Sequence, residues 1–309
     1  MMDILNKKED KETILKSTPE FKKLIQSLLI RAKIKQKTLD LFTNQENIKV
    51  FRTAFIHKSF SDDHNYEHLE FLGDTMVNNC VAEWLNETFP EIINVDWLTR
   101  MKHALISKKT LGFLARDAGF FEHIKYGEDI RESLESSQNV KDNKDYKDML
   151  EDTFEAFIGA LTRVSNSTMR RGVGYALSYN IVKSFLDELR SKGGISLNYE
   201  DYYDPISRLK EIYDKYYWDF SGSQSYNSET QEAVFWGYPK YNKKRLDIND
   251  NIIKRNKAEL ARFVGKDKES SVRGAAQQAL KTLSERYNIE GVVPNPYNRN
   301  KYRKRRTIN

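Results

Sequence analysis

Helical spacing of apolar residues runs through the first two thirds of the chain. After Thr18-Pro19, a pair that typically caps and starts a helix, apolar side chains recur every three or four residues. The same pattern predicts helices over about 46–59, 63–88, 97–119, 149–161 and 168–190. We expect the polar segment 127–146 to be a loop. No stretch between 20 and 190 alternates as a half-buried strand does, so the sequence predicts an all-α domain there.

Carboxylates gather on one face of the helix over 63–88. Glu67, Glu70 and Asp74 occur at i, i+3 and i+7, which places them in one narrow arc at about 100° per residue. The opposite side carries apolar residues that we expect to face a core: Leu69, Leu72 and Met76. Three like charges with apolar neighbours repel each other and lose hydration, so a positive partner is expected beside them.

The helix over 149–161 carries a second acidic face. Asp152 and Glu155 lie one turn apart, and the small residues Ala156 and Gly159 stand beside them. Because small side chains allow another helix to approach closely, we infer that the two helices bring all five carboxylates into one cluster. Oxygen-only ligation suits Mg²⁺ or Mn²⁺ better than zinc, and the sequence has no Cys and His set at zinc spacing.

Composition adds weaker constraints. The 309 residues suggest about two domains, and the net charge of +6 favours an anionic partner only weakly because 45 acidic residues accompany 51 basic ones. The single cysteine, Cys80, excludes an intramolecular disulfide and fits a reducing compartment. No apolar run approaches the roughly 20 residues of a membrane span, and the N-terminus lacks a signal-peptide core. We therefore expect a cytoplasmic protein without a membrane partner.

Three segments resemble the motifs of ribonuclease III, the family of enzymes that cut double-stranded RNA. HLEFLGD at 68–74, after Glu67, is similar to the family signature, DTFEAFIGA at 152–160 to its second acidic motif, and AFIHKSF at 54–60 to the segment before the signature. The resemblance implies an endonuclease domain that uses Mg²⁺, or Mn²⁺ in its place. It also implies a homodimer whose paired sites leave 5′-phosphates and short 3′ overhangs.

The same resemblance assigns roles to the acids. It makes Glu70, Asp74, Asp152 and Glu155 the metal ligands, with Asp74 and Glu155 at the essential catalytic positions. Glu67 matches a supporting acidic position that contacts substrate or orients its neighbours. We group Glu67 with the catalytic residues.

Two further positions are less clear-cut. Family members often carry one more acid soon after the segment that corresponds to Phe89-Pro90, and the alignment puts Asn94 there; Asp96 would replace it only in another register. For His57 we prefer a partly buried, hydrogen-bonded histidine to a catalytic base.

A second domain follows a Gly-containing linker. DPISRLKEIYDKYY at 204–217 and ESSVRGAAQQALKTLSERY at 269–287 resemble the first and last helices of a double-stranded RNA-binding domain. We therefore predict an α+β module of order α-β-β-β-α, with its strands near 225–238, 242–250 and 257–264. The predicted organisation is a leader (1–18), a catalytic domain (19–190), a linker (191–203), an RNA-binding domain (204–290) and a basic tail (291–309).

The RNA-binding module departs from its family where the last helix begins. Glu269 and Ser270 stand where family members usually have phosphate-gripping lysines, so we assign RNA contact to Lys266, Lys268 and Arg273 nearby. The basic tail would add salt-sensitive affinity for RNA and leaves nuclear import open.

A catalytically idle relative is the main alternative. It would bind or sequester double-stranded RNA, or serve as a ribosomal structural protein, on the same fold. Intact acids at the four metal positions argue against it, since a protein that only binds RNA gains nothing from clustered carboxylates.

Overall fold

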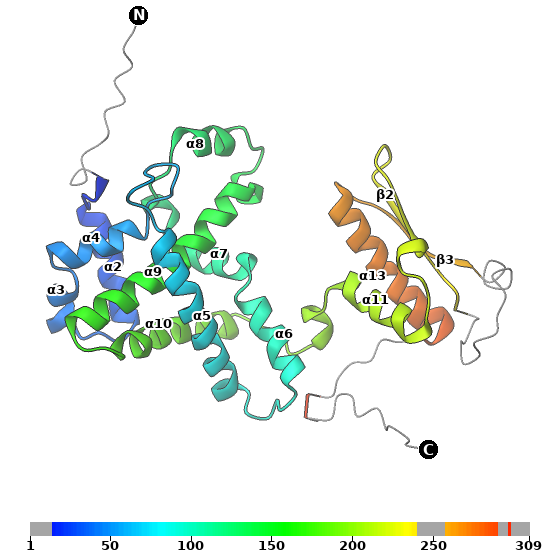
Figure 1. Ribbon diagram of the computed structural model, residues 1–309. Coiled ribbons are helices and arrows are strands. Elements are labelled where there is room, and N and C mark those ends of the chain that lie inside the picture. The colour runs from blue at the N-terminus through cyan, green and yellow to red at the C-terminus, as the bar shows by residue number, and fades with distance from the viewer. Residues whose placement is uncertain (1–13, 240–256, 290–295, 298–309) are drawn as a thin grey trace, which may run out of the picture. The chain divides into compact units, whose positions relative to one another are not determined.

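The computed structural model describes residues 14–239, 257–289 and 296–297. The chain divides into two compact units, Met1–Ser196 with Pro296–Asn309, and Leu197–Asn295 (Figure 1). Most of the predicted leader, all but 296–297 of the predicted tail and the predicted strand 242–250 lie outside the described residues.

The first unit is helical, as predicted. Between residues 14 and 196, extended pairing is limited to one isolated bridge between Ile56 and Lys125. The helices are α2 (Pro19–Arg31), η1 (Gln36–Thr38), α3 (Leu39–Phe42), α4 (Gln45–Thr53), α5 (Glu67–Thr88), α6 (Val95–Leu105), α7 (Lys108–Asp117), η2 (Phe121–His123), α8 (Glu128–Glu135), η3 (Val140–Asp142), α9 (Lys144–Thr168) and α10 (Val173–Ser191). In the part of the chain that the structure describes, none of the helices combines the length and apolar character that crossing a membrane requires.

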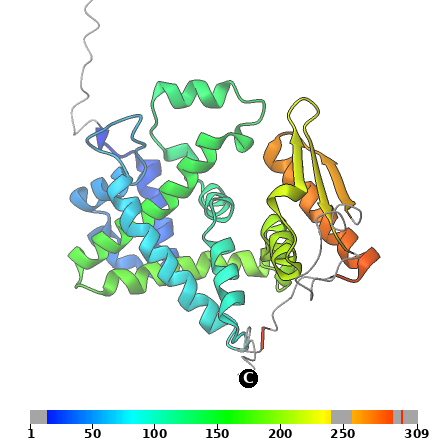
Figure 2. The same cartoon turned by 45° about the vertical axis from the view of Figure 1, so that its right-hand side comes forward.

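α9 is the central helix of this unit. α5, α7 and α10 pack along it, and α5 and α10 lie beside it in both views (Figures 1 and 2). Its aromatic residues Phe154 and Phe157 are fully buried, and Phe157 meets the ring of Phe120 edge to face with centroids 5.5 Å apart. Burial of several such rings is worth about 1.5–3 kcal/mol each, which fixes α9 as the element against which the others are placed.

Several helix ends follow the predicted chemistry. The Thr18 hydroxyl accepts a hydrogen bond from the Phe21 N–H at 3.2 Å, so α2 starts as the sequence indicated. Gly119 takes a positive φ of 74° just after α7, a conformation that glycine adopts readily where a helix ends. The predicted single helix over 97–119 is wrong, because Ser107 caps a new helix there and divides the segment into α6 and α7.

Other boundaries also differ from the prediction. The helix predicted over 46–59 ends at Thr53, since the His57 N–H turns to the carbonyl of Lys125 at 2.8 Å. The segment 127–146 is not a plain loop, because it contains α8 and η3 and anchors itself through buried Leu134. α9 continues to Thr168, so the last helix of the unit starts at Val173 and not at 168.

The second unit is a small α+β module. Its elements are η4 (Tyr199–Tyr202), α11 (Pro205–Tyr216), η5 (Ser221–Ser223), β1 (Gln224–Asn227), β2 (Glu232–Gly237), β3 (Ala258–Val264) and α13 (Lys268–Tyr287). The strands form an antiparallel sheet in the order β1-β2-β3, with Gln224 opposite Phe235 and Glu232 opposite Val264. α11 and α13 lie on one face of this sheet (Figure 1).

The core of this module lies between its two helices and the sheet. Leu209 and Ile212 of α11 pack with Ala275, Ala276 and Ala279 of α13 against the sheet. The predicted strand near 225–238 is instead a hairpin of β1 and β2, which turns at Gln231 with a φ of 54°. The predicted strand near 257–264 agrees with β3.

Candidate active site

α5 and α9 cross at a pair of glycines. A Cβ on Gly73 would lie 1.8 Å from the backbone oxygen of Glu155, and one on Gly159 would lie 2.0 Å from that of Leu69. The two backbones are therefore in direct contact, which only glycine allows at these positions. The expectation that small residues on the second acidic helix permit close approach is confirmed.

The buried face of α5 differs from the predicted one. Leu69 is buried as expected, but Leu72 and Met76 are only partly buried, whereas Gly73 and Val77 are buried. α9 contacts α5 through Gly73, so the buried stripe runs beside the acidic arc and not opposite to it. The acids consequently stand at the border between core and solvent.

A hollow of about 400 Å³ opens at this border. The structure brings together there all five acids that the sequence singled out: Glu67, Glu70, Asp74, Asp152 and Glu155. The other residues that line it are His57, Lys58, Tyr66 and Phe71. α5 supplies three of the carboxylates and α9 supplies two, so the glycine crossing is what joins the two acidic motifs.

Partial burial raises the pKa of three carboxyls in this hollow. Loss of hydration, followed by the charge of Asp74, raises the pKa of Glu155 from 4.5 to about 8. Loss of hydration, followed by the charge of Asp152, raises that of Glu70 to about 7. Burial also raises the pKa of Asp152, although a hydrogen bond from Tyr66 opposes this shift. The hollow therefore favours any cation that can offset its charge.

The carboxylates share the hollow without converging on one point. Among residues 14–239, 257–289 and 296–297, no three His, Cys, Asp or Glu side chains are grouped closely enough to form a ready-made metal centre. Mutual repulsion of like charges keeps such side chains apart until a cation lies between them. The donor set is nonetheless all oxygen, which fits a hard divalent ion.

Three neighbours of the acids were not identified as site residues from the sequence. The Tyr66 hydroxyl donates a hydrogen bond to Asp152 Oδ2 at 2.9 Å, and Lys58 Nζ lies 3.1 Å from Glu67 Oε1. His57 Nδ1 lies 2.7 Å from Ser59 Oγ and is half-buried, so the interpretation as a hydrogen-bonded histidine is confirmed. The signal for Tyr66 was its place directly before the acidic helix, where a ring with a polar tip can point back into the hollow.

Replacing Tyr66 by phenylalanine should weaken the site without removing an acid. Tyr66 is 2% exposed, so phenylalanine fills the same space while Asp152 loses its buried donor. Loss of an outer-shell partner typically costs 10–100-fold in metal affinity or activity, and we expect an effect of about that size. If the hollow holds Mg²⁺, as the family resemblance implies, a positioning role raises the Mg²⁺ concentration needed for the half-maximal rate of RNA cleavage, and titration of Mg²⁺ against the initial rate measures this. An unchanged Mg²⁺ requirement would contradict it.

Asn94 and Asp96, the two candidates for the position of an additional acid, do not line this hollow. Asn94 is 2% exposed and caps α6, where its side-chain oxygen accepts hydrogen bonds from the N–H groups of Asp96 and Trp97. Asp96 pairs with Arg100 at 3.3 Å. Both residues line a different depression, so neither lies among the residues around the acids.

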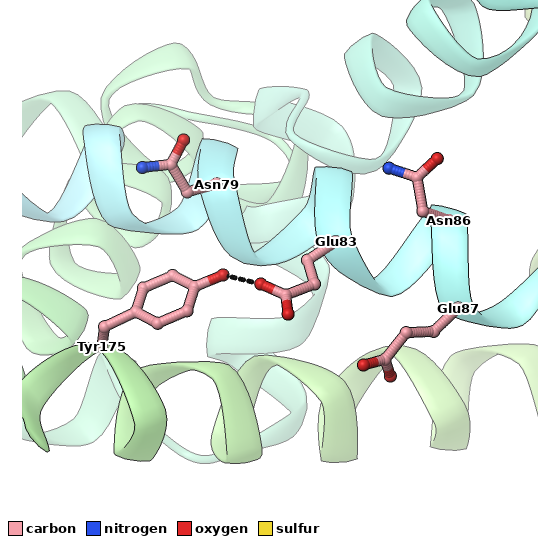
Figure 3. A pocket seen from close by; sticks show the side chains of 5 residues that line it. All are labelled: Asn79, Glu83, Asn86, Glu87 and Tyr175. Atoms are coloured by element: carbon pink, nitrogen blue, oxygen red, sulfur yellow. Dashed lines mark hydrogen bonds between the residues drawn. The ribbon is translucent and has the colours of Figure 1, made fainter.

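A second group of acids lies further along α5 and has another role. Figure 3 shows Glu83 of α5 pointing to Tyr175 of α10, and the same pocket is lined by Asn79, Asn86 and Glu87 of α5. The Tyr175 hydroxyl donates to Glu83, and one turn on the Tyr179 hydroxyl donates to Glu87. These carboxylates therefore already have partners, and the pairs fasten α5 to α10.

The cations assigned to RNA contact lie around the start of α13 in the second unit. Lys266 and Lys268 are exposed on either side of Asp267, whose side chain caps the helix by accepting from the Ser270 N–H at 2.8 Å. Arg273 pairs with Asp204, the cap of α11, at 3.2 Å. All three side chains are exposed, and Arg273 in addition forms an ion pair within the unit.

Comparison with known proteins first gives the class of the domain. Residues 67–165, which include both acidic motifs, match the family model described as Ribonuclease III domain. This match covers the whole of α5 and nearly all of α9, the two helices that build the hollow.

Individual relatives then extend the similarity beyond that domain. A protein of Invertebrate iridescent virus 6, provisionally called ribonuclease 3, is 27% identical over 90% of this chain and 92% of its own length. Ribonuclease 3 of Leuconostoc mesenteroides is 25% identical over 82% of this chain and 95% of its own. These similarities support the interpretation of this chain as a ribonuclease III-like nuclease.

Solved structures show a more distant likeness. The nuclease domain of ribonuclease III from Campylobacter jejuni is 21% identical and covers 56% of this chain and 98% of its own, with a TM-score of 0.38. Because this structural likeness is weak, the argument for function rests on the acidic hollow and on the relatives similar in sequence.

Proposed function

We propose that this protein is a Mg²⁺-dependent endoribonuclease that cleaves double-stranded RNA and leaves 5′-phosphates with short 3′ overhangs. The observation that carries the proposal is the hollow where α5 and α9 cross, in which five carboxylates from two distant motifs line one space. A protein that only bound RNA would repel its ligand there, because a phosphodiester is also an anion.

The acids divide into binding and supporting roles. Glu70, Asp74, Asp152 and Glu155 would hold the ion, with Asp74 and Glu155 at the catalytic positions and Glu67 supporting them. When bound, Mg²⁺ (or Mn²⁺) supplies the positive charge that admits a phosphodiester and lowers the pKa of water. Tyr66 holds the Asp152 carboxylate in place, and Lys58 adds a cation at the rim beside Glu67.

Removing the metal tests the proposal directly. With long perfect duplex RNA, we expect cleavage in Mg²⁺, none in EDTA, and binding without turnover in Ca²⁺, whose larger and looser coordination suits binding more than in-line chemistry. Gel analysis of end-labelled products would show the overhang length. Binding without cutting in Mg²⁺ would favour the catalytically idle alternative, and equal cleavage in EDTA would refute a metal-dependent site.

A homodimer is part of the proposal, and Phe71 is its main support. This ring lines the acidic hollow on α5, yet 81% of its surface is exposed. A large exposed aromatic side chain beside a functional site is typical of a contact with another molecule. Two copies joined there would hold two acidic hollows near each other, as cutting both strands requires.

Phe71→Asp should therefore convert a dimer to a monomer. An aspartate in place of a ring buried at an interface adds an unpaired charge there, and such changes cost about 2 kcal/mol or more. Sedimentation-velocity measurements at several concentrations check the state, and product analysis should show loss of paired-strand cleavage. Phe113→Asp, on an exposed face of α7, is the control and should leave the dimer intact. A monomeric parent protein would contradict this part of the proposal.

RNA selection would come from shape and charge, with the second unit adding affinity. Lys266 and Lys268 at the start of α13 are suited to phosphates of an A-form duplex, and the contact of Arg273 with Asp204 limits its contribution. The acids next to them, Asp267 and Glu269, reduce the local positive charge. We propose that this unit binds double-stranded RNA without reading base sequence.

A further inference from the structure

A second pocket of the first unit differs in charge from the acidic hollow. It has a volume of about 730 Å³ and lies among α7, the start of α9 and residues at the end of α10. Five cations and no carboxylates are among the residues that line it: Lys108, Lys109, Arg116, Lys141 and Lys147. Pockets of roughly 300–1,000 Å³ are the size that small ligands occupy.

Three of these cations keep their charge unpaired. Lys108 pairs with Asp148 at 2.7 Å and Lys147 with Asp142 at 4.0 Å. Lys109, Arg116 and Lys141 form no ion pair with any residue that the structure describes. A solvated cation at one site is ordinary, but three around one depression give a local field that attracts an anion.

The inner wall of the pocket is apolar and partly aromatic. Leu150 and Tyr146 are buried there, and Phe113 of α7 presents 36% of its surface. The Arg116 guanidinium lies 5.3 Å from the centroid of the Phe113 ring. Aromatic faces with an adjacent guanidinium are the surfaces on which nucleic-acid bases stack.

We propose that this pocket binds a nucleoside monophosphate, with the base against Phe113 and the phosphate between Lys109, Arg116 and Lys141. The group comes either from a free nucleotide or from the 5′-terminal nucleotide of an RNA strand, which carry the same chemistry. None of the lining residues belongs to the acidic hollow, so the inference is independent of the proposed cleavage.

Calorimetric titration of the full chain with AMP in EDTA tests the pocket itself. EDTA removes metal-mediated phosphate binding at the acidic hollow. We expect saturable binding of one AMP, weaker binding of adenosine, and a loss of roughly tenfold or more in affinity for Lys109→Gln/Lys141→Gln and for Arg116→Gln. The control, Lys35→Gln/Lys37→Gln, removes two exposed charges elsewhere in the unit and should bind AMP as the parent does.

Two further readouts locate the ligand and its source. Photolabelling with 8-azido-AMP should modify peptides from 108–117 or 141–147. Competition by a 5′-phosphorylated oligonucleotide, and not by its 5′-hydroxyl form, identifies an RNA end; competition by AMP alone identifies a free nucleotide. Absent AMP binding, equal binding of adenosine, unchanged affinity of the pocket variants, or equal competition by both oligonucleotides would overturn the proposal.

Discussion

Replacing Glu155 by glutamine should abolish RNA cleavage while RNA binding remains. Glutamine keeps the shape and helix propensity of the side chain but removes the charge proposed to hold the metal. Without that charge, the transition state should lose several kcal/mol of stabilisation. Because about 1.36 kcal/mol of activation free energy corresponds to a factor of ten in rate, we expect the cleavage rate to fall roughly 10³-fold or more. Single-turnover cleavage of labelled duplex measures this without interference from product release.

The same substitution should stabilise the metal-free protein, which distinguishes a changed site from a damaged fold. Burial and the neighbouring Asp74 raise the pKa of Glu155 from 4.5 to about 8, so its charged form disfavours the folded state. For an acid with a raised pKa, stability is lost as pH rises from the unfolded pKa to the folded pKa. In EDTA the variant should match the parent below pH 4.5 and exceed its free energy of unfolding by about 1–2 kcal/mol at pH 8.

A matched control lies one turn earlier on α9. Glu151 is partly buried and pairs with Lys108 at 3.4 Å, but it does not line the acidic hollow. Glu151→Gln makes the same chemical change and should keep cleavage within a few-fold of the parent. If both variants lost cleavage equally, general charge on α9 would matter and not the position of Glu155. If Glu155→Gln cut at the parental rate, the assignment of the catalytic site would fail.

The sequence predicted the two acidic faces because their spacing is local. Glu67, Glu70 and Asp74 share a face of any helix that contains them, whatever packs beside it. The small residues near Asp152 and Glu155 also carried information, since close approach of two helices requires them. Both features depend only on helical geometry, and the structure agrees with both.

The errors arose where a partner distant in sequence decides the outcome. Leu72 and Met76 fit an apolar stripe as well as Val77 does, but the glycine contact with α9 selects which of them is buried. Tyr66 lies directly before the acidic helix, but that local position does not indicate which acid, 86 residues away, its hydroxyl reaches. The break at Ser107 is an intermediate case, because serine caps are visible in sequence but compete with the continuing apolar period.

Replacing Gly73 by alanine should damage both stability and activity far more than its size suggests. The new methyl group would lie 1.8 Å from the carbonyl oxygen of Glu155, a backbone atom that cannot rotate away. α5 and α9 must then separate, and we expect a loss of about 3 kcal/mol or more in the free energy of unfolding, with a fall in Tm of roughly 6–12 °C. Because the displaced atom belongs to Glu155 itself, cleavage should also fall where the variant is still folded.

Gly112→Ala is the matched control for this prediction. Gly112 lies inside α7, and an added Cβ there would meet its nearest atom, the carbonyl oxygen of Lys147, at an ordinary 3.6 Å. Alanine favours a helix over glycine by about 1 kcal/mol, so this variant should be as stable as the parent or more stable. Thermal unfolding of the two variants side by side separates the crossing contact from the general effect of removing a glycine. Equal stability of the two variants would contradict the account of the crossing.

The partner glycine supplies a test of the contact itself. Gly159→Ala should cost about as much as Gly73→Ala, because its methyl group would lie 2.0 Å from the carbonyl oxygen of Leu69. Either methyl group alone opens the space between the helices, so the second would enter a gap that already exists. The double variant should therefore lose less free energy than the sum of the single losses, by about 1 kcal/mol or more. Full additivity in denaturant unfolding would mean that the two glycines act independently, and the acids of α5 and α9 would need another explanation for their common position.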